Sequence, residues 1–252
     1  MSVHMRGGER TGDAGRAMKS VAVVALKGGT GKTTVTVNLA ARAHAAGLKV
    51  MLADMDPQGS STDWSKSRSQ PGPAVAPIKL GSLFPAQYTA ANAGYDLMFM
   101  DTRASSQMDT VAAVKSADLS LIVVRPTVID LRAIAATVDL LRPLRRPAAF
   151  VINQAPSQRV GRDPVIVMEA IELLMSYGQA VAPVGLRARQ IYQTAFSQGR
   201  SPFEDDPTSP AGQEIDRLWA YVTGRLWPQA PAEPAANPAV AAPEPRAALV
   251  PA

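Results

Sequence analysis

A glycine- and lysine-rich segment near the start of the chain has the residue types that bind phosphate. It lies between an apolar run at 20–26 and a helical pattern at 32–46. In order, the segment reads Lys27, Gly28, Gly29, Thr30, Gly31, Lys32, Thr33 and Thr34. Glycines let backbone N–H groups approach a phosphate closely, and a helix N-terminus adds partial positive charge. Lys32 supplies a full charge and Thr33 a hydroxyl for Mg²⁺, so the spacing predicts a nucleotide phosphate cradle.

Acidic residues follow two later apolar runs. Asp101 ends the run at 97–100, and Asp54 ends the run at 50–53. Mg²⁺ takes hard oxygen ligands and keeps several waters, so a carboxylate at a strand end near the phosphates suits its chemistry. Asp101 is therefore the predicted Walker B ligand of Mg²⁺, although an apolar run that ends in Asp is common in unrelated proteins.

The elements that would position these residues alternate between strand and helix. Strands are predicted at 20–26, 49–54, 78–80, 95–101, 119–124, 148–153 and 180–184. Helices are predicted at 32–46, 61–66, 85–93, 108–116, 129–141, 163–177, 188–197 and 212–226, and the Pro- and Gly-rich segment 69–77 is predicted to be a loop. The strands are continuously apolar, which favours an α/β fold with a doubly wound, mostly parallel sheet and helices on both faces. Ligands of such sheets bind at the carboxyl ends of the strands, where Lys27, Asp54 and Asp101 fall.

The phosphate segment departs from the ordinary P-loop at its first positions. Leu26 stands where a glycine is usual, and a second lysine, Lys27, follows it. This deviant form resembles the ParA/MinD family of P-loop ATPases, and the chain is most similar to small partition-type ParA proteins. The resemblance implies an ATP- and Mg²⁺-dependent homodimer in which Lys27 reaches the partner subunit's nucleotide.

The segment around the first acidic pair strengthens the resemblance. Asp54 and Asp56, followed by Pro57 and Gln58, match the family's D-x-D-P-Q pattern. The resemblance assigns Asp56 to the attacking water and Asp54 to the Mg²⁺ shell. The alternative is that these acids cap a helix that starts near Ser60. After Asp101 the family usually has proline where this chain has Arg103. The resemblance therefore does not extend to the switch-like loop that follows, although it still covers the Mg²⁺ site.

Later segments resemble the family more loosely. Asn153 stands where relatives contact adenine, but an Asn at a strand end is also a routine turn residue. The segment 183–190 resembles the loop that closes over the base. Basic residues in this part of partition proteins bind DNA without reading its sequence, and the candidates are Arg187, Arg189, Arg200 and Arg217. Solvated or ion-paired arginines are the alternative for each of them.

Composition limits the other possibilities. The chain has 252 residues and no cysteine, which excludes disulfides, thiolate metal sites and cysteine-held clusters. The net charge of +5 allows a polyanionic partner. No apolar run is long enough to span a membrane, and no secretory signal is recognised, so a cytoplasmic location without membrane attachment is expected. The expected organisation is a disordered N-terminal extension at 1–19, an ATPase domain at 20–227 and a disordered Pro/Ala-rich tail at 228–252.

The sequence therefore predicts an ATPase that dimerises on ATP, binds DNA nonspecifically and associates with the nucleoid. A ParB-like or other cargo adaptor would stimulate hydrolysis, as expected for plasmid or chromosome partition or cargo positioning. Two alternatives remain open at this point. One is an accessory ATPase of conjugative DNA transfer, and the other is a small-molecule P-loop synthetase, for which no acceptor-substrate constellation is visible.

Overall fold

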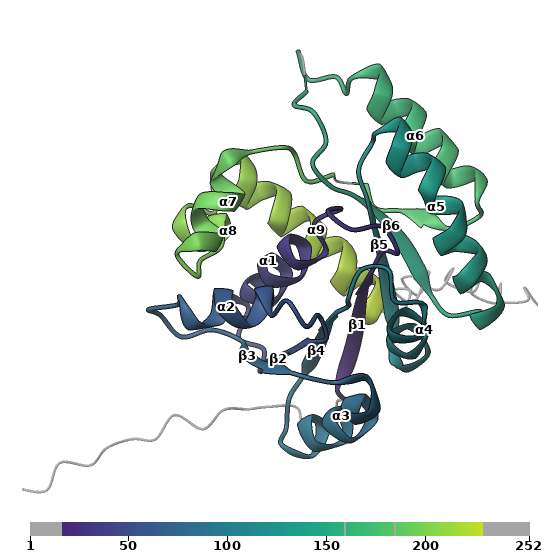
Figure 1. The fold of residues 1–252 in the computed structure, drawn as a ribbon. Coiled ribbons are helices and arrows are strands. Elements are labelled where there is room, and N and C mark those ends of the chain that lie inside the picture. Colours follow the sequence, from purple (N-terminus) through teal and green to yellow (C-terminus); the bar gives the residue numbers. More distant parts are fainter. Residues whose placement is uncertain (1–16, 159, 184, 229–252) are drawn as a thin grey trace, which may run out of the picture.

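The structure, a computed structural model, describes residues 17–158, 160–183 and 185–228. These residues contain a parallel sheet with the strand order β3-β2-β4-β1-β5-β6-β7 (Figure 1). Every pairing between neighbouring strands is parallel. The strands are β1 Lys19–Val24, β2 Val50–Asp54, β3 Ala74–Pro77, β4 Leu97–Asp101, β5 Leu119–Val124, β6 Ala148–Ile152 and β7 Ala180–Val181.

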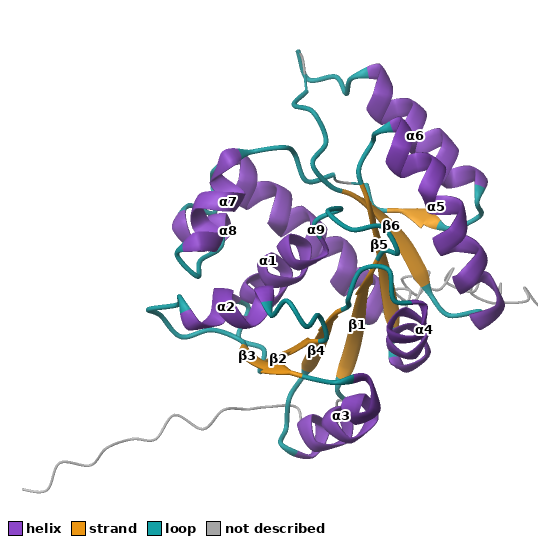
Figure 2. Ribbon diagram, in the orientation of Figure 1, coloured by secondary structure: helices purple, strands orange, loops and turns teal. Residues whose placement is uncertain are grey.

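Helices cover both faces of this sheet, and Figure 2 shows them in purple around the orange strands. The first face carries α1 Lys32–Ala45, α2 Ser60–Lys66, α7 Gln190–Ser197, α8 Pro202–Asp205 and α9 Pro210–Leu226. The second face carries α3 Leu83–Asn92, α4 Gln107–Ser116, α5 Val128–Leu141 and α6 Val165–Ser176. Short 3₁₀ turns lie at Leu80–Ser82 and Arg142–Leu144. The predicted doubly wound α/β fold is confirmed.

Successive residues of each central strand enter different cores. In β1, Val21 and Val23 pack in the cluster that includes α1 and α9. Ala22 and Val24 pack in the cluster that includes α4, α5 and α6. Side chains alternate between the faces of a strand, so a sheet that is covered on both faces must be apolar at every position. This double burial is the physical reason for the continuous apolar runs in the sequence.

One part of the predicted strand pattern is wrong. The predicted strand at 78–80 is not a strand, and the predicted loop at 69–77 contains the edge strand β3, Ala74–Pro77. Proline is compatible with an edge strand because only one side of that strand pairs with a neighbour. Here Pro77 ends β3 opposite Asp54. The Pro-rich composition of this segment therefore concealed a strand at the border of the sheet.

The predicted outer segments fall largely beyond the described part of the chain. Of the predicted extension at 1–19, residues 1–16 lie outside the described residues. Strand β1 begins at Lys19 rather than at residue 20. The tail at 228–252 lies outside them from residue 229 onward. Among the described residues, no helix is both long and apolar enough to cross a membrane.

Candidate functional site

The phosphate loop connects β1 to α1 at the carboxyl edge of the sheet. Gly31 occupies the N-cap position of α1 with a φ of 88°, a left-handed conformation that suits glycine. A Cβ atom at Gly31 would lie 2.0 Å from Nδ2 of Asn153, so a side chain there would force the Asn153 amide to move. No acidic residue occupies the first turn of α1, and its N-terminal N–H groups remain available to an anion.

Lys32 is buried at the start of α1, with 7% of its surface exposed. Burial lowers its pKa, and the carboxylates of Asp101 and Asp56 act in the opposite direction. The amine therefore lies within electrostatic reach of two of the predicted carboxylates. A buried cation beside carboxylates at a helix N-terminus is an arrangement that suits a polyphosphate.

Asp101 ends β4 next to the phosphate loop, and its register partners are Val23 in β1 and Asp54 in β2. The hydroxyl of Ser61 donates a hydrogen bond of 2.7 Å to Oδ2 of Asp101. Its other oxygen, Oδ1, is buried and has no hydrogen-bond partner in the described structure. Burial raises the pKa of Asp101 to about 6, although the hydroxyls of Ser61 and Thr33 lower it.

An unpaired, buried carboxylate oxygen fits a divalent cation, because an orphaned acceptor in the interior is costly without a partner. The described residues contain no cluster of three or more His, Cys, Asp or Glu side chains of the kind that encloses a metal ion. The remaining ligands of Mg²⁺ would therefore be the hydroxyl of Thr33, water and phosphate. This composition suits Mg²⁺, which keeps much of its hydration when it binds with nucleotides.

Asp54 and Asp56 have different roles in the local structure. Oδ2 of Asp54 accepts hydrogen bonds from the backbone N–H and the hydroxyl of Thr62, at 2.8 and 2.7 Å. Asp54 therefore satisfies the first turn of α2, as the helix-capping alternative anticipated. Oδ1 of Asp56 accepts the N–H of Gln58 at 3.0 Å, and Asp56 is only partly buried. The Mg²⁺ role of Asp54 and the water-orienting role of Asp56 stay predictions.

Lys27 forms an ion pair within its own subunit. Its amine contacts Oδ1 of Asp130, in the first turn of α5, and the guanidinium of Arg125 contacts the same carboxylate. The Asp130 side chain is only 1% exposed, whereas those of Lys27 and Arg125 are each about one third exposed. Burial would raise the pKa of Asp130, but the hydrogen bonds from Arg125 and Lys27 prevail and lower it. The carboxylate is therefore ionised and shared between two cations.

The loop after Asp101, where the sequence departs from the family pattern, packs on the phosphate loop. The hydroxyl of Thr102 donates to the carbonyl of Val23 at 2.8 Å. The N–H of Ser105 donates to the carbonyl of Leu26 at 2.8 Å. Arg103 is exposed. These contacts hold the loop against the base of the phosphate site.

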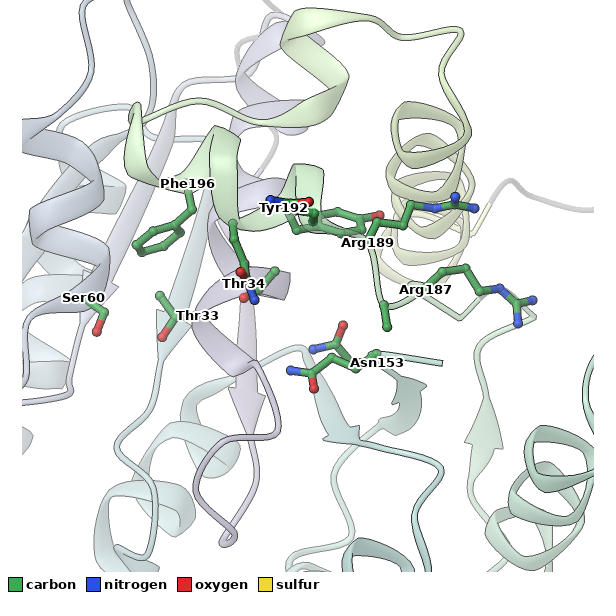
Figure 3. A pocket seen from close by; sticks show the side chains of 12 residues that line it. Thr33, Thr34, Ser60, Asn153, Arg187, Arg189, Tyr192 and Phe196 are labelled. Carbon is green, nitrogen blue, oxygen red and sulfur yellow. The ribbon is translucent and has the colours of Figure 1, made fainter. Parts of the chain in front are cut away.

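A cavity of about 610 Å³ opens beside the phosphate loop (Figure 3). Thr33 and Ser60 lie toward one end of it and Arg187 toward the other, with Tyr192 and Arg189 across from Asn153. The amide of Asn153 donates to the carbonyl of Thr30 at 2.8 Å, so it ties the end of β6 to the phosphate loop. The cavity thus joins the predicted phosphate residues to the predicted base residues. It is large enough for a nucleoside.

Three of the four predicted DNA-binding arginines form ion pairs with acids of the same chain. Arg187 pairs with Asp163 at 2.6 Å, Arg189 with Glu214 at 2.7 Å and Arg200 with Asp205 at 2.6 Å. Arg217 is exposed and has no ion pair with any described residue. The ion-paired alternative thus applies to three of these residues, and DNA contact stays a prediction for all four.

Sequence reasoning did not identify three residues that complete the site: Ser61, Asp130 and Glu214. Asp130 follows the N-cap residue Thr127 by three positions, a spacing that marks a helix start but not its ion pairs. Glu214 lies on the stripe of α9 that also carries Ala211, Ile215 and Leu218. An acid on an apolar stripe must be buried and paired, so its periodicity was a usable signal.

Comparisons with known proteins agree with this geometry. Residues 21–201 match the model of the CobQ/CobB/MinD/ParA nucleotide-binding domain. The chain is 30% identical to Maintenance of carboxysome distribution protein A from Halothiobacillus neapolitanus, over 73% of this chain and 87% of that protein. It is 25% identical to the Chromosome-partitioning ATPase Soj from Thermus thermophilus, over 83% of this chain and 97% of that protein.

Solved structures show the same fold. A variant of Cyanothece McdA in complex with ATP superposes with a TM-score of 0.69 at 15% identity, covering 87% of this chain and all of that one. The MinC:MinD cell division protein complex of Aquifex aeolicus contains a chain that superposes with a TM-score of 0.66 at 20% identity, covering 86% of this chain and 98% of that one.

Proposed function

The chain belongs to the CobQ/CobB/MinD/ParA nucleotide-binding domain family, and from this premise we propose that it is an ATP-driven switch that positions DNA or another large cargo. It is a P-loop ATPase that binds ATP with Mg²⁺. Two relatives support the positioning role, one named for carboxysome distribution and the other for chromosome partitioning. One continuous sheet with a hydrophobic core on each face supports one ATPase domain over residues 20–227.

The observation that carries the proposal is the different surroundings of the two lysines in one loop. Lys32 is buried near Asp101 and Asp56, whereas Lys27 is partly exposed and turns toward Asp130. A lysine that served only the nucleotide of its own subunit would be expected on the phosphate side of the loop. The placement of Lys27 supports a second role, in which it contacts the nucleotide of a partner subunit.

The chemistry proposed for the site divides among residues of this chain. Mg²⁺ would neutralise charge on the phosphates, with Asp101 and Thr33 as its protein ligands. Lys32 and the N–H groups of the loop hold the phosphates for in-line attack. Asp56 orients the attacking water, and Asp54 supports it through its hydrogen bond from the Asp56 N–H at 3.2 Å.

Exposed apolar side chains near the site support pairing with a second copy. Met108, at the start of α4, is 73% exposed, and Ile129, next to Asp130, is 71% exposed. Both helices begin at the edge of the sheet that carries the phosphate loop. ATP shifts the equilibrium toward the dimer only if the dimer binds ATP more tightly than the monomer. A lysine shared across the interface supplies that difference.

For DNA contact we assign Arg217 as the primary group, because its charge is not neutralised by an ion pair with any described residue. Arg187 and Arg200 contribute where DNA phosphates replace their carboxylate partners, whereas Arg189 stays paired with the buried Glu214. Binding through phosphates is independent of sequence and falls with salt. Association with the nucleoid follows from this mode. A ParB-like or other cargo adaptor would stimulate hydrolysis and so release the DNA.

An electrophoretic shift with unrelated DNA duplexes, with and without ATP, tests the proposal. ATP-dependent, sequence-indifferent binding that weakens with salt is expected for the wild type and is absent in Lys32→Ala. Arg217→Ala should reduce the slope of log affinity against log salt by about one. Preference for one DNA sequence would instead support a conjugative accessory ATPase. An ATPase without any DNA binding would contradict the proposal.

A further inference from the structure

A buried carboxylate behind the nucleotide cavity has no part in the proposed chemistry. Glu214 lies on α9 and is 4% exposed. It does not line the cavity beside the phosphate loop; it faces a neighbouring cavity on the other side of Arg187 and Arg189. A carboxylate in this position must be paired or hydrogen-bonded, because burying an unpaired carboxylate is strongly unfavourable.

Hydrogen bonds from the short segment 187–192 satisfy the carboxylate of Glu214. Oε1 of Glu214 accepts from Nε and Nη2 of Arg189, at 3.0 and 2.7 Å. Oε2 accepts from the backbone N–H of Arg187 at 3.1 Å and from the hydroxyl of Tyr192 at 2.9 Å. Each carboxylate oxygen therefore accepts two hydrogen bonds. Because two N–H groups of one guanidinium donate to Oε1, the contact fixes the orientation of the Arg189 side chain as well as its position.

The three donors all belong to the wall of the nucleotide cavity. Arg189 and Tyr192 line it across from Asn153, and Arg187 lines it toward one end (Figure 3). The backbone of this segment has other supports: the carbonyl of Ala155 accepts the N–H of Ala188 at 2.8 Å, and the N–H of Ala155 donates to the carbonyl of Leu186 at 2.9 Å. Those contacts fix the backbone of the loop, while Glu214 fixes the side chains of Arg189 and Tyr192.

Glu214 also stabilises the protonated forms of its partners. Its hydrogen bond raises the pKa of Arg189, against the effect of burial. Burial raises the pKa of Tyr192, and the charge of Glu214 raises it further. Tyr192 therefore remains a hydrogen-bond donor, and the positive charge of Arg189 is balanced. The wall formed by Arg189 and Tyr192 therefore presents planar groups with little net charge to the cavity. Such a surface suits a nucleobase better than a phosphate.

We propose that Glu214 is the positioning residue of this wall and sets the preference of the site for the base of the nucleoside triphosphate. The inference rests on the proposed function, in which the cavity holds ATP. Because the phosphate loop lies on the opposite side of the cavity, Glu214 contributes to binding of the base and not of the phosphates.

Binding of three ligands separates these contributions: ATP, CTP and inorganic tripolyphosphate, each with Mg²⁺ and measured by calorimetry. Glu214→Gln keeps the size of the side chain and removes its charge. We expect this variant to bind ATP about tenfold more weakly, which corresponds to about 1.4 kcal/mol. Its ATP-to-CTP preference should fall by a similar factor, while its affinity for tripolyphosphate stays that of the wild type.

The control is Asp216→Asn on the same helix, because Asp216 pairs with Arg42 at 2.7 Å away from the cavity. It should leave all three affinities unchanged. Tyr192→Phe removes one hydroxyl and keeps the ring, so it should shift the ATP-to-CTP ratio in the same direction even if Glu214→Gln folds poorly. The inference is overturned if the variants lose tripolyphosphate affinity as much as ATP affinity, or if they keep the wild-type ATP-to-CTP ratio. A wild type that binds no ATP would instead overturn the proposed function, and the inference with it.

Discussion

Replacing Asp130 by asparagine tests whether one buried carboxylate holds Lys27 in place. In the wild type this carboxylate takes one contact from Lys27 and two from Arg125. Hydrogen bonds to charged groups contribute about 1.5–3 kcal/mol each when they are desolvated. Both cations are about one third exposed, so each contact lies at or below the low end of that range. Asp130→Asn should therefore lower the free energy of unfolding by about 2–3 kcal/mol at pH 7.

The two single-cation variants give the internal comparison. Arg125→Ala removes two contacts and leaves Asp130 with Lys27, and it should cost about 2 kcal/mol. Lys27→Ala removes one contact and leaves Asp130 with Arg125, and it should cost about 1 kcal/mol. Urea unfolding followed by circular dichroism measures all three values. The reasoning is refuted if Lys27→Ala costs more than Arg125→Ala, or if Asp130→Asn is as stable as the wild type at pH 7.

The pH dependence of the stability difference between the wild type and Asp130→Asn is an independent test. The pKa of Asp130 is lower in the folded chain than in the unfolded one. The stabilisation is therefore complete above the unfolded pKa, near 4, and disappears as the pH falls through the lower folded pKa. The stability difference between the wild type and Asp130→Asn should be constant from about pH 8 to 5 and shrink below about pH 4. A difference that grew on acidification would contradict the assignment.

Two further predictions concern a glycine contact and the candidate Mg²⁺ ligand. A Cβ at Gly199, where φ is 65°, would lie 2.4 Å from the backbone nitrogen of Arg68, so Gly199→Ala should cost about 3 kcal/mol or more in urea unfolding. Gly224→Ala in the open part of α9 is the control and should stabilise the fold by up to about 1 kcal/mol. Because burial raises the pKa of Asp101 from 3.8 to about 6, Asp101→Asn in chelator should be more stable than the wild type by up to about 3 kcal/mol at pH 7.5. That gain should vanish as the pH falls toward 4, and an unchanged stability at pH 7.5 would contradict the assignment.

The position of the glycine-rich loop between a strand and a helix could be predicted from the sequence because its determinants are local. The loop at 27–34 lies between an apolar strand and a helix, and these neighbours dictate its geometry. The fold followed from the apolar runs, since a strand that is buried on both faces has no polar position to spare. β3 could not be found this way, because an edge strand depends on its pairing with β2 more than on its own residues.

Contacts between distant segments set the limits of sequence reasoning at the site. The three ion-paired arginines were assigned from the resemblance to partition proteins, and the sequence did not reveal that acids such as Asp163 and Asp205 lie against them. The carboxylate of Asp54 could be assigned to a metal or to a helix N-terminus, and the hydrogen bonds to Thr62 show the second use. Glu214 is the case that periodicity could have resolved, since its burial follows from its neighbours on α9.

The pairing of Lys27 bears directly on the proposal that this loop serves two subunits. If Asp130 had Lys27 as its sole partner, moving the lysine away would leave a buried carboxylate unpaired, at a cost of about 3–5 kcal/mol. Arg125 stays in contact with Asp130 through both oxygens, so the carboxylate keeps a partner when Lys27 leaves. Lys32 has no such freedom, because it is buried in the phosphate site itself. The same loop thus contains one lysine that is buried in its own subunit and one that can move at modest energetic cost.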